Sequence, residues 1–477
     1  MLTSIIWTLS SNILPLISAL ILIPILIQEY GLVNFGLITL IWAITGFFGI
    51  FDFGLSRALT QLISKSSNNK TLLKIINTGF YFSLFASLII TLVVYVCLEI
   101  FMLLNEAFVL TKNIKIVEDF KLISLIIPLT IHSSSLRGIL EGLKLFGWTS
   151  IARSTLGIGL FLFPFMGSLF FVADFKNAVL SIFILRIIIW FIYFIFCYKS
   201  KFLKLGFNFF SRIWFNKIFH TGIWMFVSNF IGPVILYIDK FIIAAFLGAG
   251  LLTYYSAPYE ILTKILVIPF SIGTVLFPFF SGLKKNNHRD NELLKESILI
   301  SYIIIFPILI LTSYLSPILL KYWIGGSLDI RETNLIVYSL IIGIWFNNTS
   351  FSLFTYIQSK GFAKYTAYLH LIELAPFILI LIILISKYGI IGAGLAWVFR
   401  HIFDLVGLTY ISKKINPLIY KKFNSIIFCF IFTILILILP YFIDNFFYRI
   451  QISFFTLIIY AIFLYKNKNL ILKFYFK

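Results

Sequence analysis

The residues of this sequence whose types and spacing could do chemistry are charged side chains inside long apolar stretches. At mid-bilayer such a side chain costs about 2.5–3.5 kcal/mol on insertion scales, so it is retained only with a partner, a cavity or a task. Basic groups there can bind an anion, and carboxylates can carry protons or bind cations. The basic members are Arg186, Lys240, Lys264 and Arg400, and the acidic members are Asp239, Glu260, Glu373 and Asp404.

Two of these acid–base pairs follow helical spacing. Glu260 precedes Lys264 by four residues, and Arg400 precedes Asp404 by four, so each pair lies on one face of a helix. Such a pair can neutralise itself for insertion, or it can serve a substrate or a coupling ion, and both readings stay open. Arg186 has no sequence-local partner, which favours a functional role.

Three further charged residues close apolar runs near the expected cytoplasmic side, and we interpret them as a cytoplasmic gate. They are Asp52, Arg57 and Arg137. A purely interfacial role is the alternative, because long basic side chains reach the headgroup region at low cost.

Hydroxyl and imidazole groups also interrupt the apolar runs. Tyr254, Tyr255 and Tyr259 offer an aromatic and hydroxyl surface of the kind that a sugar would contact. The histidines at 132, 370 and 401 lack metal-ligand spacing with one another, so no metal site is predicted.

The elements that must position these residues are membrane-spanning helices. The 477-residue chain is 61% hydrophobic and 12% charged, and its apolar runs match the roughly 20 residues that one crossing needs. We therefore predict an all-α polytopic membrane protein with about 14 transmembrane helices, the first being a retained helix at 5–28 and not a signal peptide. The predicted spans are 5–28, 33–55, 78–104, 120–140, 151–173, 177–197, 219–245, 250–281, 297–320, 334–356, 366–386, 389–411, 424–443 and 450–466.

Composition and loop length exclude several classes of protein. The net charge of +20 is dispersed over short loops instead of being gathered on a soluble face, so no nucleic-acid partner is expected. No loop has room for a catalytic domain of about 50 residues or more. The chain has no Gly-Lys-Ser/Thr phosphate loop, and its three cysteines have no paired spacing, so neither a cofactor nor a metal is expected.

Loop charges predict the orientation. With the N-terminus in the cytoplasm, 26 basic residues fall in inner loops and 8 in outer loops. Because cytoplasmic loops retain Lys and Arg, this asymmetry predicts an N-in, C-in topology.

An internal repeat appears when the chain is shifted by 217 residues. Trp7 then falls on Trp224, Ser11 and Asn12 fall on Ser228 and Asn229, and Gly31 falls on Gly248. Six crossings separate the two copies, so the repeats are parallel and related by an axis along the membrane normal. The predicted organisation is a six-helix bundle at 1–200, a basic linker at 201–218, a second bundle at 219–412 and two added helices at 413–477, with a central cavity between the bundles.

Three stretches of sequence together form a recognisable pattern. The first runs from Tyr30–Leu37 to Phe51–Leu59, and the second from Ile238–Lys240 through Tyr254–Glu260 to Phe277 and Pro278. The third is Tyr388–Trp397. In these stretches the chain resembles bacterial polysaccharide flippases, the O-antigen translocases of the multidrug/oligosaccharidyl-lipid/polysaccharide (MOP) exporter superfamily.

The resemblance implies alternating-access transport, from the cytoplasmic to the periplasmic leaflet, of an undecaprenyl-diphosphate-linked oligosaccharide such as an O-antigen, capsule or exopolysaccharide unit. It also implies a multi-pass protein of the bacterial inner membrane with a cationic cavity, to which Arg186, Lys240, Lys264 and Arg400 would contribute beside the three tyrosines. Asp239, Glu260, Glu373 and Asp404 are candidates for coupling to H⁺ or Na⁺. Membrane lipid, a polysaccharide polymerase and a chain-length regulator are the expected partners.

Alternatives remain open. A lipid II flippase and a cation-coupled multidrug exporter would share the fold, although an exporter of cationic drugs would favour acidic or apolar cavity walls. A membrane-embedded oligosaccharide polymerase or acyltransferase is the alternative from another class of protein, and such enzymes carry a sizeable periplasmic loop that this chain lacks.

Overall fold

The computed structural model describes residues 2–50, 54–66, 68–106, 121–204, 210–229, 231–282, 288–324, 328–417, 424–443 and 445–466. Within these ranges the chain is helical and contains no strand, which confirms the all-α prediction. The chain divides into two compact units, Met1–Ala244 and Ala245–Lys477. The predicted segment boundaries at 200, 218 and 412 stay predictions.

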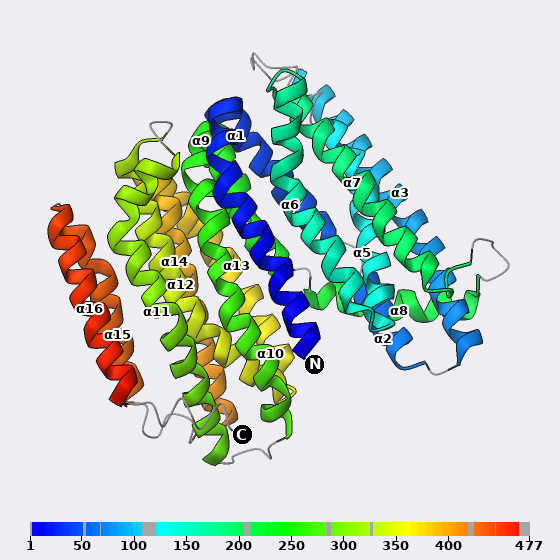
Figure 1. The fold of residues 1–477 in the computed structure, drawn as a ribbon. Helices are drawn as coiled ribbons and strands as arrows, with labels where there is room; N and C mark the ends of the chain where they lie inside the picture. Colours follow the sequence, from blue (N-terminus) through cyan, green and yellow to red (C-terminus); the bar gives the residue numbers. More distant parts are fainter. Residues whose placement is uncertain are drawn as a thin grey trace. The chain divides into compact units, whose positions relative to one another are not determined.

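The first unit (blue to green in Figure 1) is built from long apolar helices joined by short connections. Its elements are α1 (Leu2–Ile50), α2 (Leu55–Ser64), α3 (Asn69–Glu106), α5 (Ile126–Gly142), α6 (Phe146–Phe170), α7 (Phe175–Lys199), α8 (Arg212–Asn229) and the first part of α9 (Ile231–Leu262).

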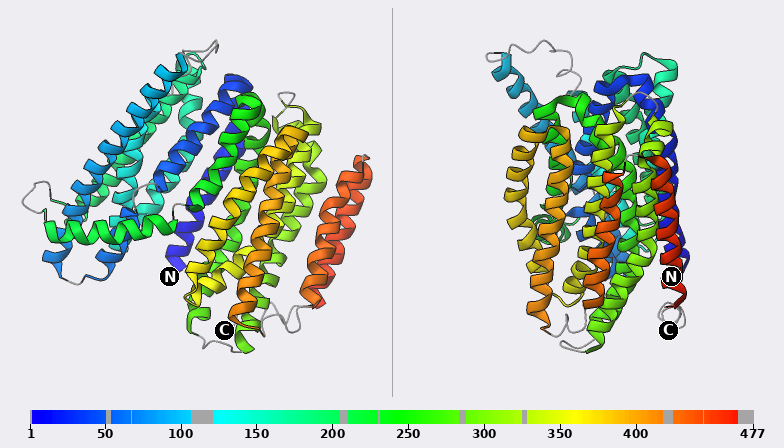
Figure 2. Two further views of the ribbon diagram at one scale, coloured as in Figure 1. Left: turned by 180° about the vertical axis from the view of Figure 1, so that it is seen from behind. Right: turned by 90° about the vertical axis from the view of Figure 1, so that its left-hand side faces the viewer.

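The second unit continues in the same way and ends with a separate helix pair, α15 and α16, which packs against α11 (Figure 2). Its elements after α9 are η2 (Thr263–Leu266), α10 (Val267–Gly282), α11 (His288–Ile324), α12 (Ile330–Ser359), α13 (Ala363–Tyr388), α14 (Ile390–Ile415), α15 (Asn424–Ile438), η3 (Leu439–Phe442) and α16 (Phe446–Lys466).

Two glycines break the two longest apolar segments. Gly31 in α1 has φ 72° and ψ 170°, and Gly248 in α9 has φ 85° and ψ 164°, values that L residues rarely adopt. Each glycine therefore marks a bend where one crossing ends and the next begins. These are the two glycines that the 217-residue shift superimposes, so the repeat has a structural counterpart.

The described residues contain ten helical segments long and apolar enough to cross a membrane, and two shorter apolar helices. Two of the ten, Ile13–Gly49 with 37 residues and Val234–Gly273 with 40, contain these glycine bends, and each is long enough for two crossings of about 20 residues. If these two segments count as two crossings each and the two shorter helices are included, the segments match the fourteen predicted spans.

One predicted span differs at its start. Residues 219–229 belong to α8, a separate helix that runs crosswise to α3 and packs against α2 and α3 (Figures 1 and 2). Lys217 lies 4.9 Å above the ring of Trp214, and such basic–aromatic surfaces are typical of membrane interfaces. The crossing itself starts at Ile231.

Candidate functional site

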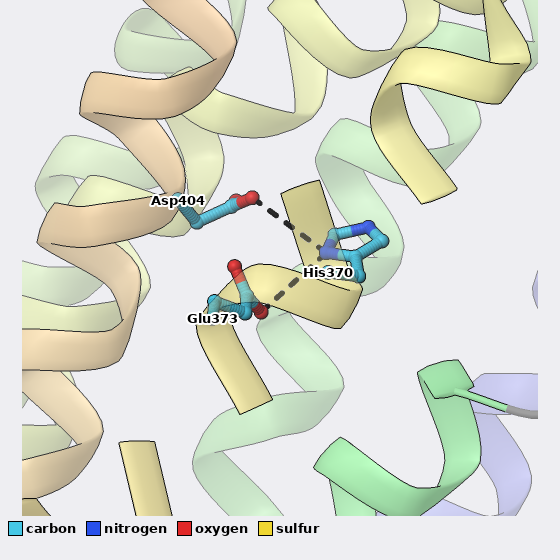
Figure 3. A group of neighbouring side chains, drawn as sticks. All are labelled: His370, Glu373 and Asp404. Carbon is cyan, nitrogen blue, oxygen red and sulfur yellow. Dashed lines mark ion pairs between the residues drawn. The ribbon is translucent and has the colours of Figure 1, made fainter. Parts of the chain in front are cut away.

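Four titratable side chains from two neighbouring helices meet inside the second unit. His370 and Glu373 lie one turn apart on α13, and Arg400 and Asp404 lie one turn apart on α14 (Figure 3 shows the two acids and the histidine). His370 Nδ1 is 3.4 Å from Glu373 Oε1 and 4.0 Å from Asp404 Oδ1. Arg400 Nε is 3.7 Å from Glu373 Oε1. We call these four residues the α13–α14 cluster.

Close packing of small residues brings α14 to its neighbours. Gly394 faces Ser339 and Ile336 of α12 so closely that a Cβ there would lie 2.9 Å from the Ser339 Cβ. Gly392 likewise packs on the backbone of α13 near Leu384. The predicted role of this glycine- and alanine-rich stretch in helix packing agrees with this geometry.

The α13–α14 cluster is buried but incompletely hydrogen-bonded. Glu373 is 2% exposed, and neither of its carboxylate oxygens has a hydrogen-bond partner among the described residues. Asp404 Oδ1 and Arg400 Nε are also without one. These atoms are therefore held by ion pairs without hydrogen bonds, and such a group can rearrange when it gains or loses a positive charge.

The donor atoms of the α13–α14 cluster could also hold a cation. One ligand atom each from His370, Glu373 and Asp404 lies within 4.8 Å of the others. Arg400 already supplies one positive charge beside them, and an apolar cavity of ≈ 200 Å³ borders Glu373 and Arg400. The ring centre of Phe377, which also lines this cavity, lies 5.6 Å from the guanidinium carbon of Arg400. In this arrangement a bound proton or small cation can replace Arg400 as the positive charge beside the two carboxylates.

A second buried charge, Arg186 on α7, lies in the first unit. It is 7% exposed, its Nε has no hydrogen-bond partner, and no described carboxylate lies within ion-pair distance of it. Its electrostatic neighbours are Tyr193 and Tyr237. One turn further on, Trp190 Nε1 donates to His132 Nδ1 at 2.7 Å, which gives this histidine a structural partner. Arg186 therefore retains its capacity to bind an anion.

The remaining predicted site residues fall into different surroundings. Asp239 and Lys240 on α9 are 2% and 1% exposed, and Asp239 Oδ1 accepts a hydrogen bond from the Lys240 backbone N–H at 2.8 Å. Glu260 lies in the last turn of α9, and Lys264 follows in η2. The helix changes to 3₁₀ geometry between them, and their pairing stays a prediction.

The three predicted sugar-contacting tyrosines are mostly core residues. Tyr255 and Tyr259 are 0% and 6% exposed and stack with ring centres 5.3 Å apart. Tyr259 also meets Trp397 edge-on at 6.0 Å. The Tyr254 hydroxyl accepts a hydrogen bond from the Asp329 backbone N–H at 3.4 Å.

Comparisons with known proteins identify the family of this chain. A family model described as "Polysaccharide biosynthesis protein" matches residues 1–284. A Shigella flexneri protein named "Putative O-antigen transporter" is 31% identical over 430 residues, which cover 86% of this chain and 97% of that protein. The chain belongs to the polysaccharide biosynthesis protein family.

Solved structures show that this family member has the MOP-transporter fold. The lipid II flippase MurJ in an inward closed conformation superimposes with a TM-score of 0.71 at 21% identity, covering 99% of this chain and all of that one. An inward-facing multidrug resistance MATE family transporter of the MOP superfamily gives 0.66 at 13% identity, covering 87% and 99%. These structures confirm the predicted fold, and the family match and the Shigella flexneri relative confirm the predicted polysaccharide family.

The structure describes two of the three predicted gate residues of this polysaccharide biosynthesis family member. Arg57 is exposed on α2, and Asp52 lies outside the described residues. Arg137 on α5 approaches Glu141 at 3.9 Å, and Arg153 on α6 approaches the same carboxylate at 3.1 Å. The gate stays a prediction, and the structure adds an α5–α6 ion pair made by Arg153.

Sequence reasoning missed His370 as a member of the α13–α14 cluster. Arg400 and Asp404 were interpreted as a pair within one helix, whereas Arg400 forms its ion pair with Glu373 of the neighbouring helix. The available signal was the three-residue spacing of His370 and Glu373, which places both on one face of α13.

Proposed function

We propose that this membrane protein is a flippase that moves an undecaprenyl-diphosphate-linked oligosaccharide from the cytoplasmic to the periplasmic leaflet of the bacterial inner membrane. The whole-length similarity to the Shigella flexneri protein supports this class of substrate. The MOP-transporter fold supports a transporter working by alternating access over an enzyme.

The observation that carries the proposal is the buried guanidinium of Arg186, which has no carboxylate within ion-pair distance among the described residues. A diphosphate cannot cross hydrocarbon bare, and a guanidinium can bind phosphate oxygens with two parallel hydrogen bonds. An exporter of cationic drugs would gain nothing from an unneutralised buried cation. Lys240, Lys264 and Arg400 remain proposed additional positive charges along the path.

Transport outward agrees with the electrical driving force. Each negative charge moved out of a cell with an inside-negative potential gains about 2.3 kcal/mol per 100 mV. We propose that inward H⁺ or Na⁺ flow adds to this through the α13–α14 cluster, with Asp239 and Glu260 as further candidates. The sugar unit is then passed to a polymerase and a chain-length regulator, and the proposed cycle needs no cofactor.

The test is reconstitution of the purified protein into liposomes with a fluorescent undecaprenyl-diphosphate oligosaccharide. The wild-type protein should transfer the lipid to the opposite leaflet. Arg186→Ala should slow transfer by about thirtyfold or more, because losing one buried charged contact costs about 2–5 kcal/mol. Arg186→Lys should restore only part of the rate if two-point phosphate binding is used.

The matched control is Lys176→Ala, which removes an exposed positive charge from the first turns of the same helix. It should leave the transfer rate unchanged. Equal rates for the wild type and Arg186→Ala would remove Arg186 from the site. Absence of transfer, together with expulsion of cationic dyes against a proton or sodium gradient, would instead assign the protein as a drug exporter.

A further inference from the structure

The first unit contains an apolar cavity of ≈ 380 Å³, and none of the predicted site residues lines it. Its walls come from the second half of α1, from α3, from the segment that leads into α5, and from the first part of α9. Of the described side chains that line it, only those of Ser124 and Tyr237 carry a polar group. Phe48, Val94 and Ile127 form one continuous apolar wall, because they pack in the same cluster.

Such a cavity favours hydrocarbon over water. An engineered apolar cavity of about 150 Å³ stays dry and binds benzene, so ≈ 380 Å³ has room for a longer hydrocarbon segment. Left empty, its walls would lose dispersion contacts that a chain would restore. The occupant that fits these walls is therefore an alkyl or isoprenoid chain.

Tyr237 connects this cavity to Arg186. Its ring lines the cavity, and the same residue is an electrostatic neighbour of the Arg186 guanidinium. Gly46 on α1 makes room for it, because a Cβ at Gly46 would collide with the Tyr237 ring and hydroxyl. A buried cation that has no carboxylate partner among the described residues and an apolar cavity thus meet at one side chain.

We propose that this cavity holds the isoprene units next to the diphosphate of the translocated lipid while Arg186 binds the diphosphate. The inference rests on the proposed function. It assigns a binding place to the lipid's isoprenoid chain as well as to its diphosphate. In a polyprenyl diphosphate the anion is joined directly to the hydrocarbon, so its recognition requires a cation and an apolar surface side by side. The acyl chain of an ordinary phospholipid is the competing occupant, and the test separates the two.

The test uses the wild-type protein in nanodiscs with a polyprenyl diphosphate that carries a diazirine in the isoprene units nearest the diphosphate. After irradiation, we expect labelled peptides from Ile44–Phe48 and Val234–Phe241. An excess of unlabelled polyprenyl diphosphate should remove the label, an equal excess of phosphatidylglycerol should not, and Arg186→Ala should weaken it. Label confined to exposed positions such as Leu88, Ile89, Leu92 and Val93, or equal competition by phosphatidylglycerol, would overturn the chain site.

A matched pair of variants on α3 adds a transport measurement. Val94→Trp fills the cavity, and Leu92→Trp places the same ring at a position that is 62% exposed on the lipid-facing side. We expect Val94→Trp to slow transfer of the fluorescent lipid about tenfold or more, as steric changes in apolar pockets do, and Leu92→Trp to match the wild type. Equal rates for both variants would count against the chain site.

The two proposals fail in different ways. If the wild type transfers the lipid but the cavity is not labelled, the chain site falls and the flippase stands. If the cavity is labelled as expected but the wild type transfers nothing, the chain site stands and the proposed function falls.

Discussion

Buried charges in this chain occur in two contrasting states. Lys360 Nζ lies 3.0 Å from Asp290 Oδ1 and also donates to the Phe280 carbonyl at 2.7 Å, and both side chains are almost completely buried. That lysine is fully occupied in holding α10, α11 and α12 together. Arg186 is as deeply buried and has no such partner among the described residues. Because an unpaired buried charge is costly, the contrast separates a structural cation from a binding one.

The α13–α14 cluster makes a prediction about ion coupling. Glu373→Gln keeps the side-chain shape but removes the negative charge that pairs with Arg400 and His370. If the cluster couples transport to an inward H⁺ or Na⁺ gradient, the variant should lose the acceleration that such a gradient gives, because Arg400 no longer has a partner whose charge the ion can neutralise. The measurement is lipid transfer in liposomes with and without an imposed gradient.

A matched control exists on α12. Glu332→Gln removes an exposed carboxylate from the first turn of that helix and should keep the gradient response of the wild type. An unchanged gradient response in Glu373→Gln would show that coupling, where present, runs through other residues such as Asp239 or Glu260.

Local spacing predicted part of this cluster and missed the rest for a physical reason. Arg400 and Asp404 share a helical face, so a pair within α14 was the natural expectation. Which acid Arg400 approaches depends on how α13 packs against α14, and that packing is set by small residues such as Gly392. Sequence spacing within one helix carries no information on that contact.

At the scale of elements, α11 and α12 are joined by a row of buried hydrogen bonds. Ser301 donates to Asn348 at 2.7 Å, and the hydroxyls of Tyr302 and Thr349 are 2.8 Å apart. Nearer the other end, Ser316 donates to Asn334. In lipid, apolar surface gives no preference for another helix, so polar contacts of this kind help to specify the partner.

The two helix-breaking glycines provide a stability prediction. Gly31→Ala and Gly248→Ala should each lower the free energy of unfolding by about 1–3 kcal/mol, because both positions have backbone angles that are essentially restricted to glycine. Space is not the cause, since no atom of the described residues lies within 4 Å of an added Cβ at either position. The measurement is unfolding of the purified protein in detergent.

Gly232 is the matched control for this effect. It also has open space around an added Cβ, but it lies in α9 without a positive φ. Gly232→Ala should change stability by no more than about 1 kcal/mol in either direction, because Gly232 is the second residue of α9 and directly precedes Pro233, where alanine does not bring the gain that it brings inside a helix. Comparable losses in all three variants would mean that the bends are not the cause.

The internal repeat predicted the positions of these bends correctly, but it did not predict the separate helix α8. A shift of 217 residues aligned Gly31 with Gly248, and both proved to be left-handed breaks. It could not predict that residues 219–229 belong to a separate helix, because the corresponding residues 2–12 of the first repeat continue within α1. Apolar composition is similar in both copies, and it does not distinguish a helix that crosses the membrane from one that runs crosswise to its neighbours.

At the scale of the whole molecule, the arrangement of basic residues predicts which side of the membrane each loop occupies. With 26 basic residues in one set of loops and 8 in the other, we expect both termini in the cytoplasm. Single cysteines placed at Val172 and Asn216, in a variant whose three native cysteines are replaced by alanine, test this orientation. Val172 is 75% exposed between α6 and α7, and Asn216 is exposed on α8.

A membrane-impermeant maleimide should label Val172→Cys in spheroplasts, because the outer loop faces the reagent directly. Asn216→Cys should be labelled only after the membrane is permeabilised. Labelling of both positions after permeabilisation is the control that each thiol is reactive. The opposite pattern in the intact spheroplasts would reverse the predicted topology. The voltage would still assist only outward movement of a diphosphate, since that assistance requires movement toward the positive side.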